Sequence, residues 1–251
     1  MVFISELVVR ETDSLPWYVW ALVAAATVGI PALTAAAIYR GGASRPAWGV
    51  GGVWALWIAV SAMLAEAGAY RQSVTKIQLW IAIALAASLA VALLGARIPA
   101  IRRALADPGA LARLTLPQTM RVGGAALLIS MALGRLPAAF AVPAGIGDIA
   151  IGISAVIIAR RLARDDRRGA VWFNALGLLD LTVAVTMGFL AGLGPVRFLD
   201  VTPSTAAIGL LPLALIPTTA VPLAVALHIV SLSRLRTTSI AADEAALASA
   251  S

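Results

Sequence analysis

Two aspartates stand inside long apolar runs of this sequence, and they are the residues best suited to do chemistry. Asp148 follows two glycines in the run GIGDIAIG, and Asp180 ends the run WFNALGLLD. A charged aspartate near the centre of a bilayer costs about 2.5–3.5 kcal/mol on insertion scales, so it must face protein or water. There it can bind a cation or take up a proton. The structural alternative is a hydrogen-bonded aspartate that joins two helices.

Helical spacing places Asp180 on a stripe of small residues that includes Gly177, Ala184 and Gly188. Such a stripe lets a second helix approach closely. If the helix begins near Ala170, ten residues at about 1.5 Å each place Asp180 about 15 Å deep, near the bilayer centre. The sequence therefore predicts that Asp180 faces the interior of a helical bundle.

Asp148 and two further charged residues are expected near the outer ends of apolar segments. Asp148 lies five residues after Pro143, or about 7 Å along a helix that begins there. Glu66 and Arg135 are expected at similar depth. Because desolvated opposite charges favour pairing, the sequence predicts a bridge from Arg135 to Asp148 or Glu66. The alternative is that these side chains line a hydrated outer vestibule.

Asn174 and His228 form a second polar level, which we expect nearer the inner side of the membrane. His228 is the only histidine of the chain, so a bis-histidine haem is excluded. A lone histidine near a helix end is more often a hydrogen-bonded interfacial residue than a ligand. With two aspartates at other depths it makes a poor metal set, and the sequence predicts neither a metal nor a cofactor.

Three prolines, Pro212, Pro217 and Pro222, interrupt the last apolar segment. Each removes the hydrogen bond to the carbonyl four residues earlier, and the hydroxyl of Thr218 can satisfy one of the freed groups. Unwound backbone at membrane depth is buried in protein or lines a cavity, and transporters bind ions with such carbonyls. The alternative is a kinked helix that only packs.

The composition explains why these polar residues stand out. Of 251 residues 61% are hydrophobic and 12% charged, and the mean hydropathy is +0.95, whereas soluble domains carry about 25% charged residues. The net charge of +7 comes from arginines between apolar segments, which is typical of membrane topology and not of nucleic-acid binding. The chain has no cysteine, so disulfides and thiolate metal sites are excluded.

Seven apolar segments predict an all-α bundle of seven transmembrane helices. The last segment is about 42 Å long as a straight helix against a hydrocarbon core of about 30 Å, so we expect it to be tilted, broken or projecting. A surface-lying connection is expected over residues 98–118, a polar tail over 1–16 and a disordered tail over 237–251. The seven segments cover about residues 17–39, 48–70, 77–97, 119–136, 143–160, 170–193 and 204–231.

The positions of the basic residues predict the orientation. Seven spans put five positive charges on one side and fourteen on the other, which favours an outer N-terminus and a cytoplasmic C-terminus. The side with five positive charges, the poor side, holds Arg10, Arg71, Lys76, Arg135 and Arg197. The side with fourteen, the rich side, holds Arg40, Arg45, Arg97, Arg102, Arg103, Arg113, Arg121, the five arginines of 160–168, Arg234 and Arg236.

Several short motifs resemble known families. At PAGIGDIAIG, WFNALGLLD, LPLALIP with the following VPL, and HIVSL, the chain resembles a group of bacterial multipass membrane proteins of no known activity, over Pro143 to Leu235. That resemblance offers a shared pattern and no mechanism; the expected location is a bacterial inner membrane. GIGD resembles the GxGD motif of intramembrane aspartyl proteases, although Asp180 follows the motif where those enzymes have the partner aspartate before it. Pro117–Gln118 is similar to one PQ motif of the PQ-loop transporters, which carry two. Microbial rhodopsins are excluded because the last span has no lysine for retinal.

These observations leave three function classes. The first is a small-solute or ion transporter in which Asp180 binds a cation or proton, with Asp148 and Glu66 as the outer approach. The second is a non-transporting sensor or scaffold subunit. The third, an intramembrane enzyme, needs Asp148 and Asp180 within reach of one water. The lipid bilayer is the expected partner, nucleic acid is not, and the oligomeric state stays open, a homo-oligomer included.

Overall fold

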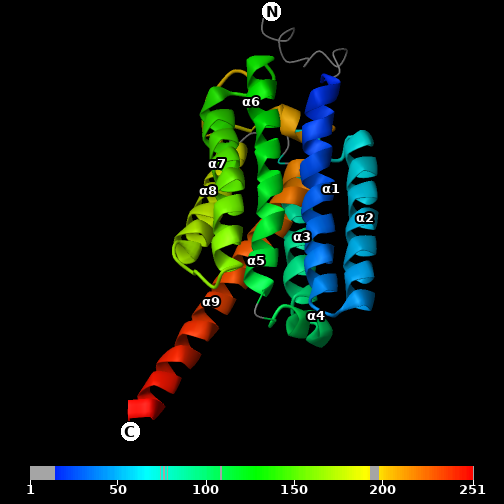
Figure 1. The fold of residues 1–251 in the computed structure, drawn as a ribbon. Helices are drawn as coiled ribbons and strands as arrows, with labels where there is room; N and C mark the ends of the chain where they lie inside the picture. The colour runs from blue at the N-terminus through cyan, green and yellow to red at the C-terminus, as the bar shows by residue number, and fades with distance from the viewer. Residues whose placement is uncertain are drawn as a thin grey trace, which may run out of the picture.

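The computed structural model describes residues 15–73, 75, 77, 79–107, 109–192 and 198–250, with side chains as far as Thr237. This part of the chain is all-α and contains no β-strand, as the sequence predicts. The helices stand side by side in one bundle, and successive rods alternate in direction (Figure 1). Residues 1–14 of the predicted polar tail, Lys76 and Arg197 lie outside the described residues.

Within the described ranges, five helical segments are long and apolar enough to cross a membrane. Many large apolar side chains of these helices, such as Leu56, Ile153 and Leu179, are exposed, as expected where lipid is the solvent. The apolar helices therefore indicate a membrane location. The five segments are α1 (Trp17–Arg40), α2 (Ser44–Glu66), α7 (Ala138–Leu162), α8 (Ala170–Leu190) and Ile216–Thr237, which joins η3 (Ile216–Ala220) to the first part of α9 (Val221–Ala250).

The other two predicted spans have different forms. The third contains α3 (Trp80–Gly95), a short apolar helix. The fourth belongs to a composite rod of α5 (Ala110–Thr115), the 3₁₀ segment η1 (Leu116–Gly124) and α6 (Ala125–Ala132). The rod already begins at Ala110, inside the predicted surface connection. The earlier part of that connection contains a separate short helix, α4 (Pro99–Ala104).

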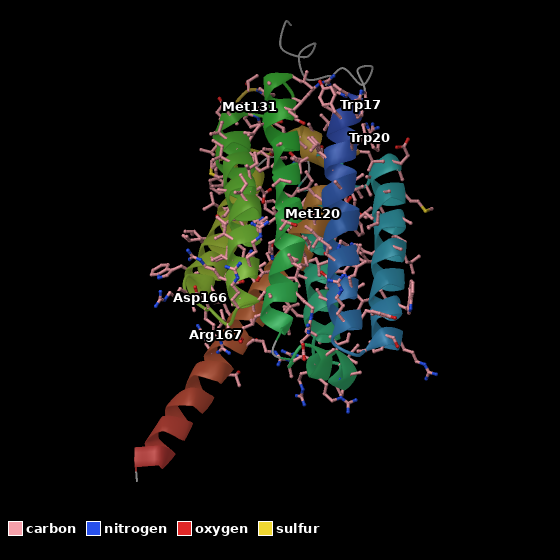
Figure 2. The ribbon with its side chains drawn as sticks, in the orientation of Figure 1. Trp17, Trp20, Met120, Met131, Asp166 and Arg167 are labelled. Atoms are coloured by element: carbon pink, nitrogen blue, oxygen red, sulfur yellow. The ribbon has the colours of Figure 1, made fainter. Side chains whose placement is uncertain are left out.

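The two ends of the bundle differ in chemistry. Figure 2 places Trp17, Trp20 and Met131 near one end and Asp166 and Arg167 near the other. We call these the N-terminal end and the arginine-rich end; α1 starts at the first and finishes with Arg40 at the second. α9 projects beyond the bundle at the arginine-rich end and continues to Ala250 (Figure 1). Residues 237–250, for which the sequence predicts disorder, are therefore helical.

The seventh segment is broken where the prolines lie. It consists of the 3₁₀ turn η2 (Thr205–Gly209), a non-helical turn, the π-helical η3 and then α9. The Thr218 carbonyl, which Pro222 deprives of its helical donor, accepts a hydrogen bond from Trp57 Nε1 at 2.8 Å. The Thr218 hydroxyl donates to the Ala214 carbonyl at 2.7 Å and accepts from Ser61 Oγ, also at 2.7 Å. Side chains of α2 therefore stabilise the unwound turn.

Replacing Trp57 by phenylalanine should expose the dependence of this turn on α2. Thr218 is fully buried, so its carbonyl would lose its donor without gaining water, at a cost of about 1–3 kcal/mol. We expect Trp57→Phe to lower the free energy of unfolding in detergent by that amount. Trp48→Phe is the matched control, because Trp48 is 78% exposed on the same helix; equal effects of the two substitutions would contradict the role of the hydrogen bond.

Glycines bring η1 to the centre of the bundle. A Cβ at Gly123 would lie 2.9 Å from the Leu22 carbonyl oxygen, and one at Gly29 would lie 2.7 Å from Met120 Sδ. Contacts this close let the backbone of α1 pack directly against η1. The segment that carries Met120 therefore lies in the middle of the molecule, as Figure 2 shows.

Candidate functional site

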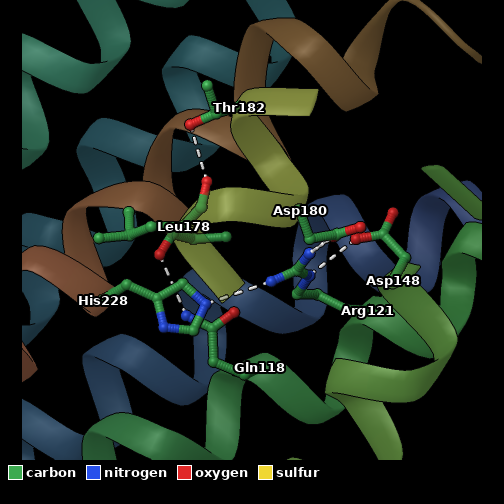
Figure 3. Close-up of polar contacts among 8 residues, drawn as sticks. Gln118, Arg121, Asp148, Leu178, Asp180, Thr182 and His228 are labelled. Atoms are coloured by element: carbon green, nitrogen blue, oxygen red, sulfur yellow. Dashed lines mark hydrogen bonds and ion pairs between the residues drawn. The ribbon is translucent and has the colours of Figure 1, made fainter. Parts of the chain in front are cut away.

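Arg121 lies at the centre of the bundle and is only 3% exposed. Its Nε donates to Oδ1 of Asp148 at 2.7 Å, and its second terminal nitrogen donates to Oδ2 of Asp180. The first terminal nitrogen lies 3.2 Å from His228 Nε2. Figure 3 shows both carboxylates pointing at the guanidinium from one side and the imidazole approaching it from the other. All three guanidinium nitrogens are therefore engaged.

Asp148 and Asp180 lie at the same level, which corrects the predicted depth of Asp148. The prediction starts the helix at Pro143, but α7 begins at Ala138, after Pro137 at the N-cap, and contains Pro143 in its second turn. Ten residues at about 1.5 Å each then place Asp148 about 15 Å from the start of α7, and Asp180 lies equally far from both ends of α8. The two aspartates can therefore share one arginine.

Hydrogen bonding fixes the tautomer of His228. A guanidinium can only donate, so Nε2 of His228 accepts from Arg121. Its Nδ1 then carries the proton and donates to Oδ1 of Asn174 at 2.9 Å, while Nδ2 of Asn174 donates to the Ala170 carbonyl at 2.8 Å. His228 is fully buried and neutral in this arrangement. The two predicted polar levels are thus one network, connected through Arg121.

Glycines let the four helical segments of the network, η1, α7, α8 and α9, pack closely against one another. A Cβ at Gly124 would lie 2.8 Å from Oδ2 of Asp148, one at Gly147 would collide with Oδ1 of Asp180, and one at Gly177 would collide with His228 Nε2. Gly177 belongs to the predicted small-residue stripe of α8, which therefore faces the polar network. The missing Cβ atoms allow the carboxylates and the imidazole to reach Arg121.

Local sequence explains the tight conformation of η1. Pro117 stands in its first turn and Gly123 and Gly124 in its last, so both ends favour a departure from regular α-helix. A stretch of 3₁₀ helix within a longer helix often marks a functional hinge or strain. Here it carries Arg121 and also Gln118, whose Nε2 donates to the Ala224 carbonyl at 3.1 Å. Oε1 of Gln118 is buried and has no donor among the described residues.

Cavities adjoin the cluster on two sides. A cavity of about 70 Å³ reaches Asp148 between α7, α8 and the broken segment, and Gln72, Pro217 and Phe189 also line it. Gln72 and Phe189 line a second cavity of about 50 Å³, together with Tyr70 and Gly192 near the N-terminal end. A third, of about 20 Å³, touches Asp148 and Arg121 from the side of α1. Each exceeds the roughly 10–15 Å³ that one water needs.

The structure brings four of the predicted site residues together and leaves others apart. Asp148, Asp180, Asn174 and His228 share the network of Arg121, whereas Glu66 is exposed at the end of α2. Arg135 lies half-buried in the turn after α6 and is not the partner of Asp148, so that predicted pairing is wrong.

The predicted residues of the broken seventh segment lie beside the network. Pro217 lines the cavity that reaches Asp148, and the hydroxyl of Thr218 stabilises the adjacent turn. Pro212 precedes η3 and Pro222 opens α9.

Sequence reasoning missed the central residue of the site. The prediction counts Arg121 among the loop arginines of the rich side because it stands close to a basic connection. The available signal was its context, since the run TMRVGGAALL is apolar and small around a single arginine. An arginine inside such a run needs an acidic partner at the same depth, and the underestimated depth of Asp148 hid that partner.

The charge balance of the site is unequal. One guanidinium faces two carboxylates, whose side chains are 16% and 15% exposed, and neutral His228 adds no charge. With both aspartates ionised the cluster carries one net negative charge in a low-dielectric interior, where unbalanced charge is costly. One proton or one monovalent cation would neutralise it. No group of three or more acidic, histidine or cysteine ligands for a metal ion occurs within the described residues.

Comparison with protein families places this site inside a shared domain. The family model DUF8737, described as a domain of unknown function, matches residues 78–236, more than half of the chain. The chain belongs to the DUF8737 family. The DUF8737 match includes every residue of the Arg121 network, whereas α1 and α2 precede it. This agrees with the predicted resemblance to a family of no known activity. No curated protein and no solved structure matches the chain.

Proposed function

We propose that this DUF8737 protein is a transporter of a small solute or ion in a bacterial inner membrane. In this proposal the chain crosses the membrane seven times, with its N-terminus outside and its C-terminus in the cytoplasm. Asp148, Arg121 and Asp180 form a central site that takes up a proton or a monovalent cation, and this uptake is coupled to movement of the solute.

The arrangement of the rods supports seven crossings. α1, α2, α3, the α5–η1–α6 rod, α7, α8 and η3–α9 alternate in direction (Figure 1). The loops at the arginine-rich end carry most of the arginines, and removing Arg121 from the count leaves that bias intact. Lys and Arg in short loops stay on the cytoplasmic side, which favours the proposed orientation.

The observation that carries the proposal is the sharing of one buried guanidinium by two carboxylates beside cavities. A purely structural ion pair needs one carboxylate per arginine. The second carboxylate leaves a negative charge that a proton or cation can neutralise, and ionisable groups of this kind mark ion and proton pathways in membrane proteins. The cavities lined by Gln72 give this charge an approach from the N-terminal end.

The same geometry argues against an aspartyl protease. Such an enzyme holds one water between two carboxylates that share a proton. Here both carboxylates are occupied by ion pairs with Arg121, so neither is free to activate a water in this state. Binding and release of a charge fit the cluster better than hydrolysis does.

Charge movement in proteoliposomes tests the proposal. The purified protein is reconstituted, adsorbed on a solid-supported membrane and exposed to a pH jump, and separately to a Na⁺ jump at constant pH. We expect a transient current for one of these two probes, because the ion enters a site about 15 Å from either end of α8. Asp180→Asn should abolish the current while the protein stays folded, since Asp148 still balances Arg121.

Asp165→Asn is the matched control. Asp165 is an exposed carboxylate in the α7–α8 loop with a φ of 59°, a conformation that asparagine tolerates well. This variant should keep the wild-type current. A wild-type protein that gives no current with either ion, or an Asp180→Asn variant that keeps the full current, would refute the transporter and favour a sensor or scaffold.

A further inference from the structure

A second, larger cavity lies away from the Arg121 network. It has a volume of about 640 Å³, within the range of about 300–1,000 Å³ that small-molecule sites occupy. Its walls come from α1, α2, α3, α4, α5 and α9, so it borders neither α7 nor α8. The lining on α2 follows one helical face, since Pro46, Gly49, Val50, Val53 and Trp54 recur at the spacing of a single stripe.

The cavity has a buried floor and an exposed mouth. Ile38, Trp54, Leu114 and Leu227 on its floor are at most 4% exposed. Its mouth is formed by exposed residues of α2, α3 and the following turn, namely Gly49, Val53, Val91, Leu94 and Ile98. The opening therefore faces sideways from the bundle, between two apolar helices, where a bilayer presents acyl chains rather than water.

The lining offers almost nothing to a polar ligand. Thr34 has the only hydroxyl group of the lining, and that group donates to the Ile30 carbonyl at 2.7 Å. The lining holds one other polar side-chain group, the indole N–H of Trp54, so a polar solute would lose its hydration here and gain few hydrogen bonds. A hydrocarbon chain would lose nothing, so the chemistry of the lining selects an apolar occupant.

Two arginines flank the cavity at the arginine-rich end. Arg45 precedes the lining residue Pro46, and Arg97 stands between the lining residues Ala96 and Ile98. Both are exposed, and no side-chain hydrogen bond or ion pair joins either of them to another residue within the described ranges. An anionic group at the membrane surface could therefore contact both, while a chain attached to it entered the cavity.

We propose that this cavity binds one anionic phospholipid, with an acyl chain between α2 and α3 and its phosphate beside Arg45 and Arg97. Charge complementarity favours this occupant over a second copy of the chain, because the mouth presents apolar side chains next to unpaired cations. The site does not depend on the transport proposal, since it shares no lining residue with the cavities that reach Asp148.

Native mass spectrometry can count the bound lipid. The full chain is reconstituted in nanodiscs of equal parts phosphatidylglycerol and phosphatidylcholine, released in mild detergent and weighed. We expect one retained phosphatidylglycerol per chain and little phosphatidylcholine. The double variant Arg45→Gln/Arg97→Gln should lower phosphatidylglycerol retention about fivefold for each arginine removed. Arg164→Gln, in the exposed α7–α8 loop, should leave retention unchanged.

A cavity-filling substitution tests the acyl-chain site separately. Gly49 and Gly52 both lie on α2, and a Cβ at either would contact nothing within 4 Å, so a side chain can start from both positions without a clash at its Cβ. Only Gly49 lines the cavity. Gly49→Phe should abolish retention, and Gly52→Phe should preserve it. Equal retention in these two variants, equal retention of both lipids, or a protein dimer with no bound lipid would overturn the proposal.

Discussion

Replacement of Arg121 by methionine is expected to destabilise the protein by about 3–5 kcal/mol, the usual cost of removing one partner of a buried ion pair. Among the described residues, the guanidinium is the only cation that pairs with Asp148 and Asp180, and His228 would also lose the donor to its Nε2. Methionine fills much of the same volume, so the loss would report charge and hydrogen bonding. Denaturation in detergent, followed by tryptophan fluorescence, measures the change.

A compensating variant separates charge from packing. In Arg121→Met/Asp148→Asn/Asp180→Asn no buried charge is left without a partner, so most of the lost stability should return. Arg164→Met, at an exposed position, is the control and should change stability by less than about 0.5 kcal/mol. If the triple variant were as unstable as Arg121→Met alone, unbalanced charge would not be the cause.

Gly147→Ala is expected to cost about 1–3 kcal/mol, as overpacking of a tight interior does. The added Cβ would collide with Oδ1 of Asp180, and this carboxylate cannot move aside without leaving Arg121. The current attributed to the site should fall together with the stability. Thermal unfolding of the purified variant and the pH-jump or Na⁺-jump measurement check the two effects.

Two comparisons make this prediction specific. Gly51 lies on α2, where a Cβ would contact nothing within 4 Å. Gly51→Ala should therefore leave the free energy of unfolding unchanged or raise it by up to about 1 kcal/mol. In an Asp180→Ala background the collision partner is gone, so Gly147→Ala should cost little. A full cost in that background would place the strain elsewhere in the α7–α8 contact.

Periodicity and hydropathy were sufficient to predict the all-α class and the apolar helices, because long uncharged runs have few other structures available to them. They also drew attention to Asp148, Asp180, Asn174 and His228. Helix boundaries were harder to predict. Pro143 resembles a first-turn proline, yet α7 begins at Ala138, and this difference of five residues separated two aspartates that in fact lie level.

The partner of those aspartates depended on tertiary structure. Whether an arginine belongs to a loop or to the interior depends on where its helix begins, and the α5–η1–α6 rod starts earlier than hydropathy indicates. Trp57 shows the same limit, because its bond to the Thr218 carbonyl spans 161 residues of sequence. Local patterns reveal that Pro222 frees a carbonyl, but they do not reveal which distant side chain will bind it.

α9 is one continuous helix that connects the Arg121 network, through His228, to the C-terminal end of the described chain. His228 lies in its second turn, and the helix then continues for 22 further residues to Ala250, about 33 Å at 1.5 Å per residue. If this rod pivots near His228, a rotation of about 10° displaces its far end by about 6 Å, as the same length implies. A rearrangement around Arg121 too small to alter the bundle would thus be amplified at the C-terminus.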